Sequence, residues 1–375
     1  MRQPDFIFER PRSLIVKLGR LNWLLLVLLM LLASTGLLAL FSVAGGSWSP
    51  WAERHAVRFL AGMALLLVIA VTPLRTWLKL AWPSYVAALG LLALVPLLGI
   101  EALGARRWLA LGGLVFQPAE VMKVALVGAL ARFYHDLAPT RVSQPLCMLW
   151  PVLLIAAPVF LIARQPDLGT AMLLGLVGLG LMLMAGVNWL YFVAAGLAML
   201  AAVPYGLSHL HDYQRRRLET FLDPGRDPLG AGYHITQSKI ALGSGGVSGK
   251  GFLAGTQGQL DFLPEKHTDF IFTTIGEEWG FVGAASVLVL FALLIIVLGV
   301  MAIAARSRFG GLLVAGATLT LFGYAAINVA MVTGLVPVVG VPLPFVSYGG
   351  TSILTLMFGL GLAMSAWVHR AERLR

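Results

Sequence analysis

A carboxylate at the edge of a long apolar run is the residue in this sequence best suited to chemistry. Asp269 follows His267 and Thr268, and the apolar segment after it continues to about Ala304. Ionisable groups at membrane depth are rare and usually face an interior cavity, which makes Asp269 a candidate functional residue. A second interpretation is that Asp269 or Thr268 only caps the helix that begins here. The functional interpretation is favoured by the other charged residues of this short stretch: Glu265, Lys266, His267, Glu277 and Glu278.

A second set of charged residues lies inside another apolar run. Glu120 and Lys123 are three positions apart, and Gln117 and Pro118 open the same run. A helix is expected to begin here, because proline is tolerated at the first helical position and acids are favoured in the first turn. Side chains three positions apart share one face of a helix. The spacing fits two interpretations equally: a structural pair that neutralises itself, or a pair that faces a polar cavity.

The composition sets the class of protein to which these helices belong. Of the 375 residues, 59% are hydrophobic and only 12% are charged, far from the composition of soluble domains. Runs that can cross about 30 Å of hydrocarbon as a helix predict ten transmembrane segments: 21–43, 56–74, 80–100, 118–135, 146–163, 168–187, 189–207, 270–304, 310–333 and 347–368. The prediction is an all-α polytopic membrane protein with one domain over 1–375 and a long loop at 208–268, between the seventh and eighth helices.

The charges of the loops predict how the chain is oriented. Lys and Arg are denser in the segments on the side of the N-terminus than in the short loops of the other side. Because such an excess marks the cytoplasmic side, 1–20 is expected to be a cytoplasmic juxtamembrane segment, 369–375 a cytoplasmic tail and 208–268 an extracytoplasmic loop. The net charge of +10 then reflects topology and anionic membrane lipid, and it is not interpreted as nucleic-acid binding.

Two features argue against common kinds of site. Cys147 is the only cysteine, so the chain has no disulfide framework and no cysteine-based metal site. The glycine-rich run 243–251 invites comparison with a phosphate-binding P-loop, but Ser244 replaces its leading glycine and Gly251 replaces the residue that would hold magnesium. A flexible turn is expected there, with a nest of backbone amides as the alternative.

Four of the predicted helices begin on the outer side with polar residues. They are the helices over 118–135, 168–187, 270–304 and 347–368. Free amides and the positive end of the helix dipole favour anions at such positions. If the four ends converge, they form an outward-facing anion site suited to a diphosphate, together with the nearby cations Arg107, Lys123, Lys239 and Lys250. For Arg107 and its neighbour Trp108, anchoring at the membrane interface is the alternative.

Six ordered motifs between Arg106 and Thr351 resemble one known family. They are Gln-Pro-Ala-Glu at 117–120, Gln-Pro-Asp-Leu-Gly-Thr-Ala at 165–171, Phe-Leu-Asp-Pro at 221–224, the Gly-Tyr-His-Ile-Thr-Gln-Ser-Lys run at 232–246, Phe-Leu-Pro-Glu-Lys-His-Thr-Asp-Phe-Ile-Phe at 262–272 and Pro-Phe-Val-Ser-Tyr-Gly-Gly-Thr-Ser at 344–352. The chain resembles the shape, elongation, division and sporulation (SEDS) family, and its rod-shape RodA branch more than the FtsW-like division branch. Ala119 stands where the family often has serine, which affects only a local bond at the helix start.

The resemblance implies a ten-helix peptidoglycan glycosyltransferase that polymerises lipid II during cell-wall elongation. The active site would face the outside of the cytoplasmic (inner) membrane, and a class B penicillin-binding protein would be the partner transpeptidase. Asp269 would be the essential carboxylate, and Glu120 and Lys123 would line the central cavity. The expected substrate-binding residues are Glu120, Lys123, Arg107, Trp108, Asp167, Lys239, His267, Thr268 and Ser347.

The chemistry available to these residues suits that reaction. Transfer from undecaprenyl diphosphate to a 4-hydroxyl with inversion is a single displacement, so one general base is sufficient. Asp269 is the hypothesised base. The diphosphate leaving group needs charge stabilisation, for which Lys123, Arg107, Lys239, the helix N-termini and a divalent cation (Mg²⁺ or Mn²⁺) are candidates. No metal ligands are assigned.

Two other functional classes stay open. A lipid II flippase also fits ten spans with intramembrane charges and interrupted helices. An internal inverted repeat would favour that class, but the Gln-Pro starts at 117 and 165 recur in helices of the same direction. A non-catalytic scaffold for a penicillin-binding protein would instead place its polar residues on a partner-facing surface.

Overall fold

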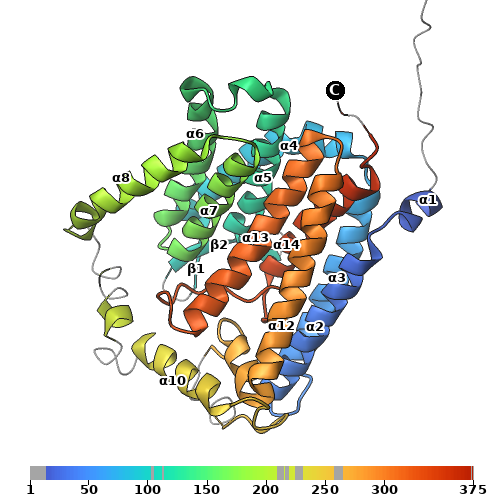
Figure 1. Cartoon of the computed structure of the whole chain (residues 1–375). Helices are drawn as coiled ribbons and strands as arrows, with labels where there is room; N and C mark the ends of the chain where they lie inside the picture. The colour runs from blue at the N-terminus through green and yellow to red at the C-terminus, as the bar shows by residue number, and fades with distance from the viewer. Residues whose placement is uncertain are drawn as a thin grey trace, which may run out of the picture.

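The computed structural model shows a bundle of long helices (Figure 1). It describes residues 14–102, 105–111, 114–208, 215, 219–223, 231–256, 265–372 and 374. Ten helices in this part of the chain have at least 17 residues: α2 Trp23–Val43, α3 Trp51–Val71, α4 Leu74–Leu98, α5 Pro118–Asp136, α6 Pro145–Ala163, α7 Leu168–Met184, α8 Trp189–Ser208, α12 Ile271–Ala304, α13 Arg308–Val332 and α14 Thr351–Val368. Two shorter helices are α1 Leu14–Gly19 and α10 Ala231–Ser244.

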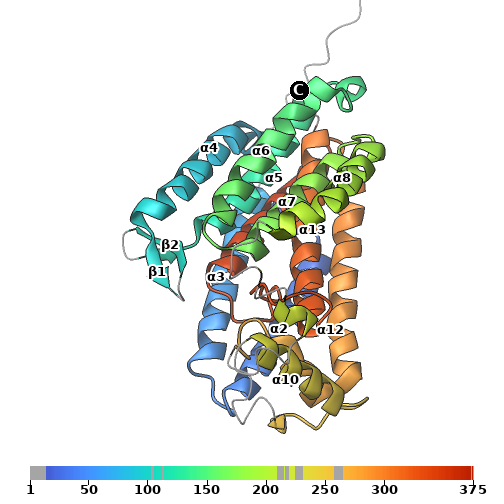
Figure 2. The ribbon, with the colours of Figure 1, turned by 90° about the vertical axis from the view of Figure 1, so that its left-hand side faces the viewer.

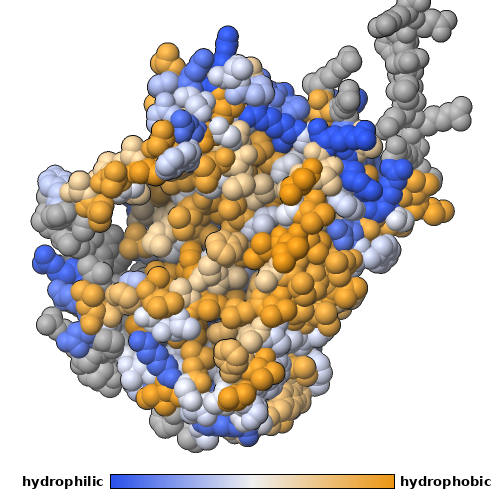
Figure 3. Space-filling model, viewed as in Figure 1, coloured by the Kyte–Doolittle hydropathy of each residue, from blue (hydrophilic) through white to orange (hydrophobic). Residues whose placement is uncertain are grey.

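The bundle has the character of a polytopic membrane protein. Seven helices are long and apolar enough to cross a membrane, namely α2, α3, α4, α6, α12, α13 and α14, and α7 and α8 include shorter apolar stretches. Helix α5 is not among these nine because Glu120, Lys123, Arg132 and Asp136 interrupt its apolar sequence. Large apolar side chains cover much of the outer surface in this view, while hydrophilic ones gather toward the two ends of the bundle (Figure 3). Ile303 on α12, for example, is 88% exposed, as expected of a side chain that faces lipid.

Each predicted transmembrane segment coincides with a helix, although some ends differ. Helix α3 begins at Trp51, five residues before the start predicted near residue 56. The apolar pattern missed this first turn because Glu53 and Arg54 are charged although their backbone is already helical.

The all-α class is confirmed, and a small antiparallel sheet that was not predicted from the sequence lies between two of the helices. Strands β1 Ile100–Ala102, β2 Ala105–Leu111 and β3 Leu114–Phe116 pair in the order β1-β2-β3 between α4 and α5. The sequence does contain a signal for this hairpin, since two glycines separate Leu111 from Leu114 and Gly-Gly is a typical two-residue hairpin connection.

Both ends of the described chain lie at the same end of the bundle. Helix α1 lies near the end predicted to be cytoplasmic (Figure 1). The C-terminus lies toward the same end, and α10 lies at the opposite end in both views (Figures 1 and 2). Lys17 of α1 donates to the Val71 carbonyl at 2.8 Å, which ties this short helix to the end of α3. The predicted loop 208–268 therefore includes an ordered helix, α10, and an ordered run to residue 256, while 209–214, 216–218, 224–230 and 257–264 are outside the described residues, as are 1–13, 373 and 375 of the predicted terminal segments.

The glycine-rich run packs against a break in α12. Gly280 interrupts this helix with φ 66° and ψ −162°. The amides of Phe281 and Val282, beyond the break, donate to the carbonyls of Gly246 and Val247 at 2.8 and 3.1 Å. The run 243–251 thus supplies acceptors that the interrupted helix lacks. The amides of Lys250 and Gly251 donate in turn to the carbonyls of Glu277 and Glu278, both at 3.0 Å. The run is therefore packed on α12, and these two amides are not open to an anion as in the alternative of an amide nest.

We expect Gly280→Ala to destabilise the protein. A Cβ at this position would meet Gly249 N at 2.3 Å, and the positive φ alone costs a non-glycine residue about 1–3 kcal/mol. Thermal unfolding of the purified protein in detergent should show a lower Tm. Gly299→Ala in the same helix is the control, because a Cβ there meets nothing within 4 Å. Equal Tm values for the two variants would contradict the tight packing of the glycine run.

Helix α13 is central in the bundle. It packs against α5, α7, α10, α12 and α14, and two polar residues, Tyr324 and Asn328, are buried on it. They are four positions apart and therefore lie on one face, about 6 Å from each other along the helix axis. This face connects the two parts of the candidate site.

Candidate active site

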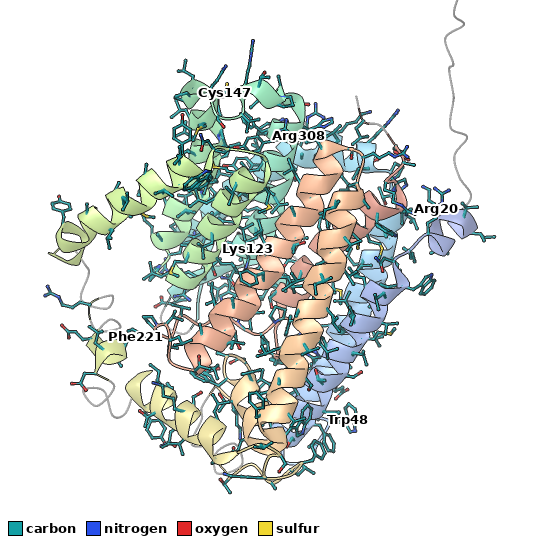
Figure 4. All side chains as sticks on the ribbon, viewed as in Figure 1. Arg20, Trp48, Lys123, Cys147, Phe221 and Arg308 are labelled. Carbon is teal, nitrogen blue, oxygen red and sulfur yellow. The ribbon has the colours of Figure 1, made fainter. Side chains whose placement is uncertain are left out.

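The inner part of the candidate site is a buried charged cluster. Lys123 Nζ lies 2.6 Å from Glu120 Oε1, and Tyr324 OH donates to both Glu120 oxygens at 2.9 Å. Thr355 Oγ1 donates to Glu120 Oε2 at 3.1 Å, and Lys123 also contacts the Tyr324 hydroxyl. Figure 4 places Lys123 in the interior of the bundle. Every Glu120 oxygen has a partner, as a buried carboxylate requires.

Two cavities lie next to this cluster. One is lined by apolar residues of α5, α13 and α14 and by Thr320 and Thr355. The other is lined by Tyr324 and by residues of the segment 342–356. Glu120 and Lys123 are not among the lining residues of these two cavities. Thr355 lines the first cavity and Tyr324 lines the second, and both side chains bind Glu120. The Glu120–Lys123 pair therefore lies behind the walls of these two cavities.

The outer part of the candidate site contains Asp269. Its backbone carbonyl accepts a hydrogen bond from Asn328 Nδ2 at 2.8 Å. Its carboxylate faces Gly340, where an added Cβ would lie 3.4 Å from Asp269 Oδ2. No described residue donates a hydrogen bond to this carboxylate. Asp269 is thus held through its backbone, and its partly exposed side chain is free to bind a substrate.

The helix-cap interpretation of this stretch is wrong. Helix α12 begins at Ile271, and its N-cap residue is Phe270, which makes no side-chain cap bond. Thr268 Oγ1 donates to Glu265 Oε2 at 2.7 Å and caps no amide of α12. Within the part of the chain that the structure describes, no side chain caps the first turn of α12.

The environment of Asp269 suits a base that works near neutral pH. Burial raises the pKa of Asp269 to about 7, and the negative charge of Glu265 acts in the same direction. A pKa shifted toward the working pH is characteristic of catalytic acids and bases. Burial lowers the pKa of the neighbouring His267, so this ring favours its neutral form.

An aromatic cluster fixes the backbone before Asp269. The ring of His267 stacks on Trp51 of α3 with centroids 3.9 Å apart, and the His267 carbonyl accepts from the Tyr348 amide at 2.9 Å. Arg58 of α3 lies 4.6 Å above the Tyr348 ring. Helix α3 and the segment before α14 therefore hold the catalytic candidate from one side.

Three of the predicted substrate-binding residues are engaged within the protein. Arg107 on β2 donates to the carbonyls of Gln165 and Pro166 at 3.1 and 2.5 Å. Asp167 caps α7 by accepting from Thr170 N at 3.2 Å, and Ser347 Oγ accepts from the Leu343 amide at 2.8 Å. These contacts shape the loops around the site. Trp108 is partly buried on β2, opposite Ile100.

The cations proposed for a diphosphate differ in what they already bind. Lys123 is paired with Glu120, Lys250 lies 2.7 Å from Glu277, and Arg107 binds backbone carbonyls. Lys239 on α10 is exposed and donates to no described residue. Its side chain crosses Gly334 at the end of α13, where an added Cβ would be 2.6 Å from Lys239 Nζ. Lys239 is therefore the cation of this set that is available to an anionic substrate.

Helix α10 brings Lys239 to the start of α12. Ser238 Oγ donates to the Val332 carbonyl at 2.8 Å and lies 2.8 Å from Thr273 Oγ1. Thr273 is in the first turn of α12, four residues after Asp269, so Lys239 and Asp269 belong to the same end of the bundle. The described residues include no group of three His, Cys, Asp or Glu that could hold a metal ion. Mg²⁺ usually binds through one or two carboxylates and substrate phosphates, so a divalent cation at the diphosphate stays a prediction.

Sequence reasoning missed the residues that connect the two parts. Tyr324 and Thr355 bind Glu120, Asn328 binds the backbone of Asp269, and Trp51 and Tyr348 contact His267. A signal was present for two of them, because Tyr324 and Asn328 recur at a spacing of four within an apolar span.

Comparisons with known proteins agree with this architecture. The family model FTSW_RODA_SPOVE, described as "Cell cycle protein", matches residues 18–372. The chain is 44% identical over 349 residues to peptidoglycan glycosyltransferase MrdB of Escherichia coli (strain K12), covering 92% of this chain and 93% of that protein. It is 37% identical to the probable peptidoglycan glycosyltransferase FtsW of Geobacter sulfurreducens (strain DL-1 / KN400), covering 84% of each chain.

Solved structures have the same fold. A chain from a structure described as showing "structural coordination of polymerization and crosslinking by a peptidoglycan synthase complex" superposes with a TM-score of 0.82 at 32% identity, over 93% of this chain and 98% of the other. The crystal structure of the rod shape determining protein RodA of Thermus thermophilus gives a TM-score of 0.71 at 29% identity, over 94% and 98%.

Proposed function

This chain belongs to the FtsW/RodA/SpoVE (SEDS) family, and we infer from this membership that it is a peptidoglycan glycosyltransferase of the RodA type. The identity to MrdB exceeds that to the FtsW relative, 44% against 37%. The geometric observation that carries the proposal is the Asp269 carboxylate, which has no hydrogen-bond donor in the described chain and a pKa raised to about 7.

The proposed substrate is lipid II, and the proposed product is a longer glycan with release of undecaprenyl diphosphate. All ten long helices cross the cytoplasmic (inner) membrane, with both termini cytoplasmic. This orientation is supported by the position of α1 and the C-terminus toward one end of the bundle and of α10 at the other (Figure 1). Asp269 and Lys239 then face the outside, where the diphosphate headgroup of a lipid-linked sugar would lie.

Asp269 acts in this scheme as the general base. It takes the proton of the acceptor's 4-hydroxyl, whose oxygen forms a bond to the donor's anomeric carbon from the face opposite the diphosphate. The bond between that carbon and the diphosphate oxygen breaks, and its electron pair leaves with undecaprenyl diphosphate, so the configuration inverts. Lys239 and the uncapped amides of α12 stabilise the negative charge of the leaving group. Glu120 and Lys123 set the position of α5 against α13 and α14.

A class B penicillin-binding protein is the proposed partner, and membrane lipid surrounds both. The support for a partner is the likeness to a chain from a peptidoglycan synthase complex that coordinates polymerization and crosslinking. The division of labour would be polymerisation by this chain and crosslinking by the transpeptidase.

Polymerisation of labelled lipid II by the purified protein in detergent tests the proposed activity. Glycan chains should form, and they should be absent with Asp269→Asn, which excludes a contaminating polymerase. Detergent micelles have no two compartments, so product also excludes a flippase without polymerase activity. Absence of product from folded protein in complex with its partner would favour the flippase or the scaffold.

The rate of polymerisation should rise with pH through about 7. Only the ionised Asp269 can accept a proton, and with a pKa of about 7 roughly a tenth of the carboxyl is ionised at pH 6 and about nine tenths at pH 8. Initial rates measured at saturating lipid II from pH 5.5 to 8.5 would show this. A profile that is flat over this range would contradict a base with a raised pKa.

Glu265→Gln provides a matched test of the cause. The charge of Glu265 raises the pKa of Asp269, so its removal should move the midpoint of the rate profile to lower pH. Glutamine keeps an oxygen that can accept the Thr268 hydroxyl, as Glu265 does at 2.7 Å. An unchanged midpoint would show that Glu265 does not act on the base.

A further inference from the structure

Asn328 is a fully buried polar residue that the proposed reaction does not use directly. It is 0% exposed on α13, and its Nδ2 donates to two carbonyls, that of Asp269 at 2.8 Å and that of Val341 at 2.7 Å. The other side-chain atom, Oδ1, is buried without a hydrogen-bond partner in the described chain. A side chain that served packing alone would avoid such an unpaired oxygen, because leucine has a similar volume and no polar atoms.

The two carbonyls belong to two different walls of the site. One is the backbone of Asp269 itself. The other is next to Gly340, the residue that the Asp269 carboxylate faces and that has φ +72°. Both amide protons of Asn328 are thus used to hold the catalytic segment and the segment behind its carboxylate at one separation.

The Gly340 segment is in turn fixed by α7. An added Cβ at Gly169 would lie 2.6 Å from the Val339 carbonyl, so the first turn of α7 packs closely on this segment. Asp167 caps that turn. The Gln-Pro-Asp-Leu-Gly motif therefore supports the wall behind Asp269 from outside, and Asn328 joins this wall to Asp269 from inside.

We propose that Asn328 is a positioning residue for glycosyl transfer, which fixes the Asp269 carboxylate by binding the Asp269 and Val341 carbonyls together. The proposal rests on the proposed function, since it requires Asp269 to be the base. Misplacement of a reacting group by about 1 Å can reduce a rate about 100-fold, so loss of this brace should act on kcat more than on substrate binding.

The test compares Asn328→Leu and Asn328→Asp in the full-length protein with labelled lipid II. Asn328→Leu removes both hydrogen bonds, and we expect kcat to fall about 10- to 100-fold with KM changed less than about threefold. When protonated, Asn328→Asp can donate one hydrogen bond, but its ionised form repels both carbonyls. Its rate relative to Asn328→Leu should therefore increase as the pH is lowered, which loss of packing would not produce.

Thr333→Val at the end of the same helix is the control. Its hydroxyl bonds only to carbonyls of its own helix, Val329 and Ala330, so kcat should stay at the wild-type value. Folding of each variant is checked by Tm and by elution as a single species. The positioning role is overturned if Asn328→Leu is folded and retains the wild-type kcat and pH midpoint. It is also overturned if the ratio of the Asn328→Asp rate to the Asn328→Leu rate is the same at all pH values.

The same assay separates this inference from the function on which it rests. If Asp269→Asn is inactive while Asn328→Leu is fully active, only the positioning role fails. If Asp269→Asn is active as well, the assignment of the base fails with it.

Discussion

Asp269→Asn should reduce the rate of lipid II polymerisation by about 100- to 10,000-fold, the contribution expected of a general base. Asparagine has nearly the same shape but cannot accept the proton of the acceptor hydroxyl. The backbone bond from Asn328 to the Asp269 carbonyl does not involve the carboxylate, so the fold should be unaffected. The measurement is the initial rate of glycan formation by purified protein in complex with its penicillin-binding partner.

Thr268→Val serves as the neighbouring control. It removes a hydroxyl that bonds to Glu265 and leaves Asp269 in place, so we expect a change of less than about tenfold, in the range of a single hydrogen bond. The assignment of Asp269 fails if Asp269→Asn polymerises at the wild-type rate. Equal losses in both variants at unchanged Tm would place the effect in the 265–269 turn and not in the carboxylate.

Lys123→Met should destabilise the protein by about 3–5 kcal/mol, the cost of leaving one partner of a buried ion pair uncompensated. Lys123 and Glu120 are 3% and 6% exposed, so water cannot replace the lost partner. The Tyr324 and Thr355 hydroxyls would still bind Glu120, but no cation would remain in contact with it. Thermal unfolding in detergent measures the loss.

The double variant Glu120→Gln/Lys123→Met gives the decisive comparison. It removes both charges, and glutamine can still accept from Tyr324 and Thr355, so the double variant should recover much of the stability that Lys123→Met loses. The ion-pair account is contradicted if Lys123→Met melts at the wild-type Tm. It is also contradicted if the stability lost by the double variant equals the sum of the losses in Glu120→Gln and Lys123→Met. The rate of polymerisation by the double variant then tests the two interpretations of the Glu120–Lys123 spacing. A rate near that of the wild type indicates a structural pair, and a large loss of rate in stable protein indicates a functional pair.

The helices were predictable because their signal is local. A membrane span needs only length and apolar composition, and every predicted span has its helix in the structure. Local signals also made Asp269 a candidate, since an acid next to an apolar run is unusual wherever the run packs. The strands were missed because β1 and β3 have only three residues each, too few to show a periodicity.

The partners of the charged residues could not be predicted in the same way. Arg107 and Lys250 have the charge that a diphosphate requires, but Arg107 is bound by two carbonyls before α7 and Lys250 by Glu277. Asn328 and Tyr324 are ordinary polar residues in the sequence, and their roles come from how α5 and α12 pack on α13. Such contacts join positions 59 and 204 residues apart, and no local pattern encodes them.

The pH dependence of polymerisation in wild-type protein and in Asp269→Asn, measured side by side on labelled lipid II, tests the central claim most directly. If the Asp269 carboxylate is the base, the wild-type rate rises through about pH 7, whereas the residual rate of Asp269→Asn is low and does not show this rise. A variant that keeps the wild-type midpoint and amplitude would show that another group takes the proton.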